Sequence, residues 1–360
     1  MSTSPAKNYS RLSELDALRG FAALLVVAFH LTMFCDIREV TKTFKYGMTG
    51  VQLFFMLSGF VIFMSLNNIK TGKEFIIHRF ARLYPIYWVC VALTFLLRIG
   101  DSLQSHEAIT MQHVYNFLTN LTMIQYYFKV PDMDAPYWSL IIELLFYVLI
   151  FSIYKLKLLR YTEYILCALV VVELVLLILQ LYLPGNAVMA NIIAGEKYFP
   201  LIHHLPLFLT GIVFYRIFID GGNMVRYCII LICFFTQVFE YPHLILNLFN
   251  ITQEQFVYVL VVYFTLFILF TFGYLRFIAG RFTIFLGRIS YALYLFHQFI
   301  ATHFVIPLLT YKWHIPYMVS ALITLVLVIT IAAINTLYID EPLRFRIRKS
   351  FTSHKFLPEK

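Results

Sequence analysis

Long apolar segments alternate with short polar spacers along most of the chain. Each apolar segment is close to the roughly 20 residues that a helix needs to cross a bilayer. The pattern predicts ten membrane-spanning helices, over residues 17–36, 48–67, 84–99, 137–155, 161–183, 200–218, 224–240, 254–275, 288–309 and 316–338. We therefore predict an all-α, polytopic integral membrane bundle with no large water-exposed domain.

One further apolar stretch, Tyr115–Phe128, is shorter than the others and contains Asn116, Asn120 and Gln125. Polar side chains are costly in the hydrocarbon core, so we interpret this stretch as re-entrant or interfacial. The sequence does not choose between these two arrangements. An eleventh span here would also break the charge alternation described next.

Positive charge is distributed asymmetrically along the chain. With ten spans and the N-terminus in the cytosol, 20 of the 28 lysines and arginines lie in or beside cytosolic segments, 7 lie outside and Arg19 lies in the first span. This satisfies the positive-inside rule and predicts that both termini are cytosolic. The domain prediction is a membrane domain over residues 1–343 and a basic cytosolic tail over 344–360. The net charge of +9 thus reflects topology, and we expect no nucleic-acid partner.

Composition supports the membrane assignment. The chain is 61% hydrophobic and 13% charged, whereas soluble domains are about half apolar and about a quarter charged. Aromatic residues make up 18%, which suits belts at the two membrane interfaces. The first sixteen residues lack the apolar core of a signal peptide, so we expect no cleavage.

The first span contains two ionisable residues on one stripe. Arg19 and His30 are eleven residues apart, so on a helix they lie about 20° apart around the axis and about 16 Å apart along it. A charge at this depth costs about 3 kcal/mol. A cytosolic helix end and a hydrogen-bonded core histidine would explain each residue alone. Two on one stripe, with Asp16 just before them, favour a functional site that faces the bundle interior.

Residues 75–85 alternate apolar and basic side chains at helical spacing, and we expect this segment to lie along the inner membrane interface. Arg79 and Arg82 share one face of it and suit an anionic group. Anchoring to lipid headgroups explains them equally well. A cytosolic ligand that carries phosphate is the sharper hypothesis.

The fourth span carries Ser139, Glu143 and Tyr147 at i, i+4 and i+8, which makes one polar stripe. Glu143 is the only acidic residue in that span. Such residues are usually partnered and often functional, and Arg19 and His30 are the candidate partners. A purely structural Glu–Arg pair is the alternative.

Polar residues also mark the second and ninth spans. Ser58 belongs to a small-residue stretch of the second span, which we interpret as a helix-packing surface. In the ninth span, Ser290, Tyr294 and His297 fall on one face, with Tyr291 beside them. His203 lies near the outer end of the sixth span, but no histidines, cysteines or acids occur at metal-ligand spacing, so we expect no metal site.

The last span ends near Pro342, which we expect to terminate the helix. Asp340 and Glu341 precede it, and Arg288 or Arg344 are their expected partners. We interpret these pairs as structural.

Six motifs occur in a fixed order along the chain. They are LD-x-LRG at 15–20 with His30, GV-x-LFF-x-LSGF at 50–60, Arg79-x-x-Arg82-x-x-Pro85, Trp138-Ser139-Leu140 with Glu143, LG-x-ISY-x-LYL-x-H at 286–297, and Glu341-Pro342. Together they resemble the acyltransferase type 3 family of bacterial membrane proteins. The resemblance implies ten membrane helices and transfer of an acyl group, often acetyl, from coenzyme A to carbohydrates.

The resemblance also implies roles for individual residues. His30 and Arg19 match residues essential in that family, and Arg79 and Arg82 match its acyl-donor motif. Our own mechanistic hypothesis is that Glu143 orients His30, which acts either as a base or as a transient acyl carrier. Further residues expected to line the site are Asp16, Ser58, Ser139, Tyr147, Ser290, Tyr291 and His297. Two departures from the family pattern are His78, a weaker cation than usual, and Gln52, where an acid is common.

The implied function is transfer of an acetyl group from a cytosolic acyl-CoA to a hydroxyl of O-antigen, exopolysaccharide or a lipid-linked glycan. Acyl-CoA would be a co-substrate, with no permanently bound cofactor. The expected partners are a carbohydrate acceptor, including polyprenyl-linked forms, and membrane lipids; the expected location is the bacterial inner membrane, as a stand-alone, multi-pass member. The competing hypotheses are an exporter of a small acylated or anionic metabolite and a glycan-sensing protein. Neither consumes a thioester, and no inverted repeat supports a transporter.

Overall fold

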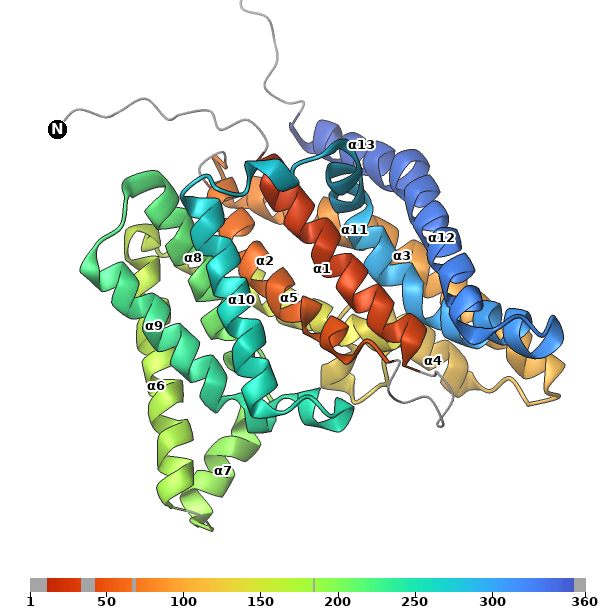
Figure 1. Ribbon diagram of the computed structural model, residues 1–360, viewed down its shortest axis with the longest axis horizontal. Coiled ribbons are helices and arrows are strands. Elements are labelled where there is room, and N and C mark those ends of the chain that lie inside the picture. The colour runs from red at the N-terminus through yellow and green to blue at the C-terminus, as the bar shows by residue number, and fades with distance from the viewer. Residues whose placement is uncertain (1–11, 34–42, 67–68, 184, 353–360) are drawn as a thin grey trace, which may run out of the picture.

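The computed structural model describes residues 12–33, 43–66, 69–183 and 185–352. Within these ranges the chain is helical and has no β-strand (Figure 1), so the predicted all-α class is confirmed. Residues 34–36 of the predicted first span and 353–360 of the predicted tail lie outside the described ranges. The α-helices are α1 (Ser13–Thr32), α2 (Gly50–Leu66), α3 (Gly72–Gln104), α4 (Met111–Asn120), α5 (Trp138–Lys155), α6 (Thr162–Tyr182), α7 (Ala187–Glu196), α8 (Leu205–Asp220), α9 (Met224–Phe239), α10 (Gln253–Thr271), α11 (Arg281–Phe299), α12 (Tyr317–Asn335) and α13 (Glu341–Thr352).

Nine of the described helices are long and apolar enough to cross a bilayer. The predicted span 224–240 is not among these nine; it corresponds to α9, which has 16 residues and rises about 24 Å. That is shorter than the roughly 30 Å hydrocarbon core. The count of ten spans and the cytosolic termini therefore stay predictions.

Helix starts in this bundle follow local capping signals. Thr71 and Asn223 accept hydrogen bonds from backbone N–H groups in the first turns of α3 and α9. Thr252 does the same for α10 and forms a reciprocal capping box with Gln255. These side chains satisfy N–H groups that have no partner within the helix. They set where the helices enter the bundle.

The stretch 115–128 does not cross the bundle. Its only α-helix, α4, has ten residues and rises about 15 Å. Asn120, which is buried, donates to the Pro131 carbonyl at 3.0 Å and accepts from the Met133 amide at 2.8 Å. The asparagine that argued against a span thus organises the loop that follows α4.

Residues 75–85 correct one prediction. They do not form a separate interfacial segment but the beginning of α3, one continuous helix of 33 residues. Their basic face turns into the bundle, where Arg79 is only 9% exposed. Pro85 leaves the helix continuous, and the Tyr291 hydroxyl from α11 donates to the Leu83 carbonyl of α3 at 3.0 Å.

Pro342 corrects a second prediction, because it begins a helix rather than ending one. Helix α12 continues through a π-helical turn, Thr336–Asp340, and α13 starts at Glu341. Pro342, which has no N–H, follows directly after this π-helical turn, where the helical hydrogen-bond register already changes. The predicted ion pairs are confirmed: Glu341 binds Arg288, and Asp340 binds Arg344.

The tightest helix contact joins α1 to α11. A Cβ placed on Gly287 would lie 1.9 Å from the Asp16 carbonyl oxygen, and one on Gly20 would lie 2.8 Å from the Leu286 Cβ. Without side chains at these two positions, the helix backbones come into direct contact. Gly211 allows the same approach between α8 and α2, where an added Cβ would lie 2.0 Å from the Met56 carbonyl oxygen. These contacts decide which polar stripes face one another.

Asp134 holds the segment before α5 onto α11. It is 3% exposed, and its Oδ2 accepts the Phe299 amide at 3.1 Å. Burial is the main influence on this carboxyl and raises its pKa to about 7, although the Phe299 amide and the charge of Arg98 oppose the rise and that of Asp132 adds to it. Stability near this anchor should therefore depend on pH.

We expect Gly287→Ala to lower the thermal unfolding temperature of the protein in detergent, because overpacking against the Asp16 backbone costs about 1–3 kcal/mol. Gly100→Ala in α3 is the matched control. Its Cβ would meet nothing within 4 Å, and the alanine favours a helix. Equal unfolding temperatures for the two variants would show that α1 and α11 are not in direct contact.

We expect Asp134→Asn to raise the unfolding temperature clearly at pH 8 and by much less at pH 5. An unfolded aspartate has a pKa of about 4, so only the native state binds this proton between about pH 4 and pH 7. Native stability therefore falls as pH rises through that window and stays lowered above it. Thermal melts at both pH values measure this, and the same shift at each would contradict it.

Candidate functional site

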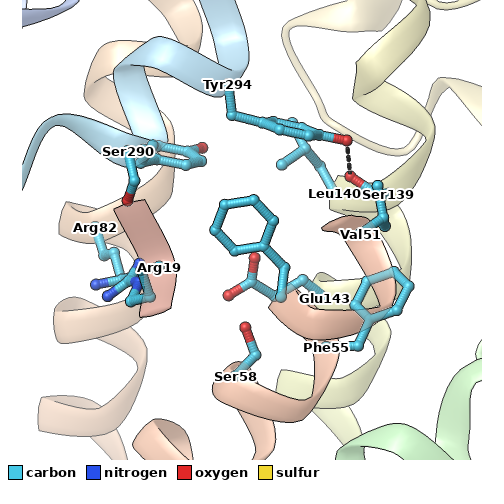
Figure 2. A pocket seen from close by; sticks show the side chains of 12 residues that line it. Arg19, Val51, Phe55, Ser58, Arg82, Ser139, Leu140, Glu143, Ser290 and Tyr294 are labelled. Atoms are coloured by element: carbon cyan, nitrogen blue, oxygen red, sulfur yellow. Dashed lines mark hydrogen bonds between the residues drawn. The ribbon is translucent and has the colours of Figure 1, made fainter. Parts of the chain in front are cut away.

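A polar cavity lies in the middle of the bundle, between α1, α2, α3, α5 and α11. It is narrow, with a volume of about 40 Å³. Its walls combine four aromatic rings with charged and hydroxyl side chains (Figure 2). The lining residues are Arg19, Val51, Phe54, Phe55, Ser58, Arg82, Ser139, Leu140, Glu143, Ser290, Tyr291 and Tyr294.

Two arginines face this central cavity side by side. Arg19 comes from α1 and Arg82 from α3, and their guanidinium groups lie together in Figure 2. Neither has a hydrogen-bonded or ion-paired side chain among the described residues. Adjacent cations in a largely apolar bundle are unfavourable unless an anion neutralises them. The pair therefore forms a candidate anion-binding site.

Glu143 of α5 lies across the cavity from these arginines (Figure 2). Its carboxylate accepts a hydrogen bond from Tyr147 at 2.5 Å. The structure thus brings Glu143 to the same cavity as Arg19, as predicted, with Tyr147 as its hydrogen-bonding partner. The two arginines keep their donors directed at the cavity.

A side arm of the cavity reaches Arg79. Arg79 donates to the Ser65 hydroxyl, and its guanidinium lies 5.4 Å from the ring centroids of Phe75 and of Tyr147. The arm is also lined by Arg19 and Arg82. All three predicted arginines therefore converge on one space, although they come from two helices.

The cavity opens toward the end of the bundle where α1 begins and α13 lies. The opening has a volume of about 260 Å³. It mixes both charges but is rich in arginine, and we call it the basic mouth. Its lining residues are Asp16, Arg19, Arg82, Gly287, Arg288, Ser290, Tyr291, Glu341 and Arg344.

His30 lies farther along α1, paired with His297 of α11. Its Nδ1 lies 2.9 Å from the Val26 carbonyl oxygen and 3.0 Å from His297 Nε2. Because a carbonyl only accepts, Nδ1 of neutral His30 carries the hydrogen and Nε2 keeps its lone pair. The same argument places a hydrogen on His297 Nδ1, which lies 2.7 Å from the Tyr294 carbonyl oxygen. The pair therefore presents His30 Nε2 as its free base.

Tyr294 connects the histidine pair to the central cavity. Its hydroxyl donates to the Pro136 carbonyl at 2.8 Å and lies 2.7 Å from the Ser139 hydroxyl. Its ring contacts His297, with 5.8 Å between ring centroids. Tyr294 and Ser139 therefore lie together in the wall of the central cavity (Figure 2), and the ring of Tyr294 also contacts His297.

Glu143 and His30 form no hydrogen bond with each other among the described residues, so the orienting role expected of Glu143 stays a prediction. The side chain that contacts His30 is His297, while Glu143 is bonded to Tyr147. Both α5 and α11 carry a polar stripe, and the glycine contact at Gly287 places the stripe of α11 against α1. The polar pattern within α11 did predict that His297 and Ser290 share a face, but no sequence signal showed which helix that face meets.

Sequence reasoning did not assign two groups to the site. Arg288 and Arg344 were interpreted as structural partners of acids, yet both also line the basic mouth. Tyr294 was noted on the face of α11 but not placed in the cavity wall. The arginines at the ends of predicted spans were the available signal, since they lie beside Arg19 and Arg82 at one end of the bundle.

A second, outer pocket lies at the opposite end of the bundle. It has a volume of about 290 Å³. Its lining includes Gln52, Trp138, His203, His204 and His243. Gln52 and His204 are both buried, and Gln52 Oε1 and His204 Nδ1 have no hydrogen-bond partner within the described residues. Val51 lines both this pocket and the central cavity. The two spaces therefore approach each other at Val51.

Comparison with known proteins gives a consistent set of relatives. Residues 12–336 match a family described as an acyltransferase domain. The chain is 29% identical over 157 residues to the peptidoglycan O-acetyltransferase OatA of Listeria monocytogenes, which covers 39% of this chain and 24% of that protein. It is 27% identical to the O-acetyltransferase OatA of Staphylococcus aureus, over 97% of this chain and 59% of that protein.

A third relative is the acyltransferase MdmB of Streptomyces mycarofaciens, 34% identical over 151 residues, or 38% of each chain. The matches thus span between 24% and 59% of the length of these three relatives. No solved structure matches this chain.

Proposed function

The chain belongs to the acyltransferase domain family, and we propose that it moves an acetyl group from a cytosolic acyl-CoA to a hydroxyl group of a carbohydrate. The single observation that supports this most is the pair of guanidinium groups, Arg19 and Arg82, which form no ion pair among the described residues and line both the central cavity and the basic mouth. The positive-inside charge pattern supports a mouth on the cytosolic side of the membrane. The membrane that we propose is the inner membrane of a bacterium.

The donor end of the proposed site is the basic mouth. Coenzyme A carries several phosphate charges, and arginine binds phosphate through two parallel N–H donors. Arg288 and Arg344 at the mouth would meet the nucleotide end, although each already pairs with an acid. Arg79, Arg82 and Arg19 would hold the donor deeper in, where few other groups compete for an anion.

The chemical centre of the proposed site is His30. Its Nε2 lone pair takes the proton of the acceptor hydroxyl as the oxygen bonds to the thioester carbonyl carbon. The carbon–sulfur bond then breaks, and the leaving coenzyme A thiolate takes up the proton. His297 supports this role because its Nε2 accepts the Nδ1–H of His30 and keeps the base on the opposite ring nitrogen. Arg19 or Arg82 would stabilise the developing oxyanion.

The acceptor would enter through the outer pocket. Buried amide and imidazole atoms without partners, on Gln52 and His204, suit hydroxyl groups, and Trp138 supplies an apolar ring beside them. This arrangement suits a carbohydrate ring, which has polar edges and apolar faces. The two OatA relatives are named as O-acetyltransferases, one of them of peptidoglycan, and we propose a surface or lipid-linked glycan here.

We expect Arg82→Ala to raise the KM for acetyl-CoA by about 10-fold to 100-fold, because a hydrogen bond to a charged group is worth about 1.5–3 kcal/mol. The measurement is thioester consumption by purified protein in lipid vesicles, with a glycan acceptor. Arg276→Ala, at an exposed position outside the cavity, is the control and should leave the KM unchanged. A lowered kcat with an unchanged KM would argue against a donor-binding role for Arg82.

We expect His30→Ala to lower kcat by about 10²-fold or more, the usual contribution of a general base. His303→Ala, at an exposed position of the same residue type, should retain activity. The assay also tests the activity itself, because an exporter or a glycan sensor would consume no thioester, with or without these substitutions. Normal transfer by a correctly folded His30→Ala protein would remove His30 from the chemistry.

A further inference from the structure

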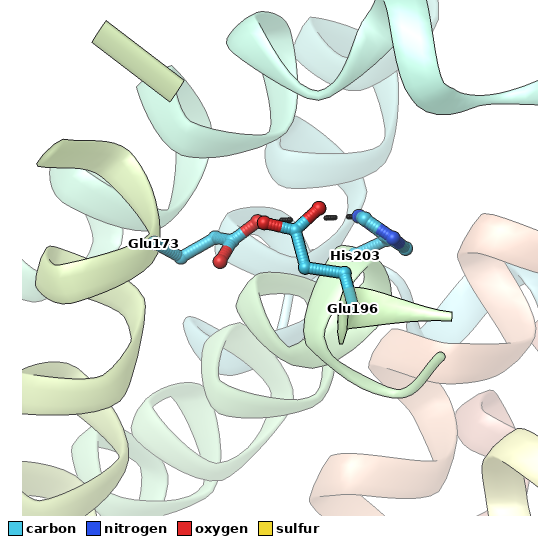
Figure 3. Close-up of side chains that lie close together, drawn as sticks. All are labelled: Glu173, Glu196 and His203. Atoms are coloured by element: carbon cyan, nitrogen blue, oxygen red, sulfur yellow. Dashed lines mark ion pairs between the residues drawn. The ribbon is translucent and has the colours of Figure 1, made fainter. Parts of the chain in front are cut away.

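A second cluster of ionisable residues lies away from the central cavity, where α6, α7, α8 and α9 meet. Glu173 of α6, Glu196 at the end of α7 and His203 before α8 bring their ligand atoms within 4.8 Å of one another (Figure 3). Glu240, just after α9, joins them through its Oε2, which lies 3.0 Å from His203 Nδ1. Residues from α6, from the end of α7, from the turn before α8 and from the end of α9 thus converge on one point.

Two of these acids are buried and incompletely satisfied. Glu173 is 2% exposed and Glu240 0% exposed, and the Oε1 atom of each has no hydrogen-bond partner within the described residues. The unpartnered Oε1 of Glu173 faces His203 Nδ1 at 4.0 Å. No described lysine or arginine forms an ion pair with either acid. One histidine cannot balance the two buried carboxylates, and unbalanced buried charge is strongly unfavourable.

We propose that Glu173, Glu196, His203 and Glu240 bind a divalent transition-metal ion of the Zn²⁺ type. One imidazole nitrogen with carboxylate oxygens is a zinc donor set, whereas Mg²⁺ prefers oxygen ligands and keeps much of its water. Zinc bonds of about 2.0–2.2 Å place tetrahedral ligand atoms about 3.4 Å apart. The 3.0 Å and 4.0 Å separations from His203 Nδ1 lie on either side of that value, so small side-chain movements would complete the site.

His203 is already held in a suitable orientation. Its ring stacks on His243, with 5.7 Å between centroids and 6° between planes. Packing of this kind limits rotation of the imidazole, as supporting groups do at metal sites. His203 and His243 also line the outer pocket. A bound ion would therefore tie α6, α7 and α9 to the wall of that pocket.

The absence of a metal motif in the sequence does not conflict with this proposal. We expected no metal because no ligands occur at close spacing along the chain, and the four residues here span positions 173 to 240. The available signal was Glu173 itself, an acid deep within an apolar span, which is costly unless it has a partner. The alternative compensation is a proton shared between Glu173 and Glu240, which lie within hydrogen-bonding reach of each other.

The test uses the full chain, purified in detergent and stripped with a chelator. Isothermal titration with Zn²⁺ and metal analysis after dialysis should show one bound ion per chain, and Zn²⁺ should raise the thermal unfolding temperature, because it binds only the folded cluster. Mg²⁺ should do neither. These readouts are independent of acetyl transfer, so failure of one proposal leaves the other standing.

Matched variants separate the cluster from adventitious binding. Glu240→Gln and His203→Ala should each weaken Zn²⁺ binding by about tenfold or more, and Glu196→Gln, at a half-exposed position that tolerates change, should also weaken it. Glu254→Gln, at an exposed position outside the cluster, should bind normally. Unchanged binding in the three cluster variants would overturn the proposal. So would a wild-type protein that binds no Zn²⁺ and is stabilised, without metal, by Glu173→Gln, since that identifies the shared proton.

Discussion

The close contact between α1 and α11 is the constraint on which the central site depends. Gly287 leaves no room for a side chain against the Asp16 backbone, so the two helices can approach only with these surfaces together. That approach sets His30 beside His297 and brings Arg19 into the space lined by Ser290 and Tyr294. A looser contact would separate the imidazoles and open the cavity wall.

Burial of ionisable groups in this apolar bundle is tolerated in three different ways. At the basic mouth, the buried carboxylate of Asp340 pairs with Arg344. In the histidine pair, neutral rings satisfy one another and backbone carbonyls. Arg19 and Arg82 form no ion pair among the described residues and face a cavity that they share with Glu143. These two arginines are therefore the groups whose bonding a ligand can complete.

Part of the site was predictable from spacing along single helices. The i, i+4 stripe on α5 placed Ser139 and Glu143 in one cavity, and Arg79 and Arg82 turned to one interior space. Predictions failed where they depended on what lies outside the helix. Residues 75–85 looked interfacial because a basic face suits lipid headgroups, but α5 and α11 cover that face. Pro342 looked like a helix end, although it suits a helix start equally well.

The sequence by itself determined the helical class, most of the helix positions and the residues that share each helix face, because apolar length and a 3.6-residue period are local properties. Only the tertiary structure decided which faces meet. It paired His30 with His297 rather than Glu143, and it gathered Glu173, Glu196, His203 and Glu240 from four segments. Such contacts depend on close packing between distant segments, at glycines such as Gly287 and Gly211, and that complementarity has no signature in one stretch of chain.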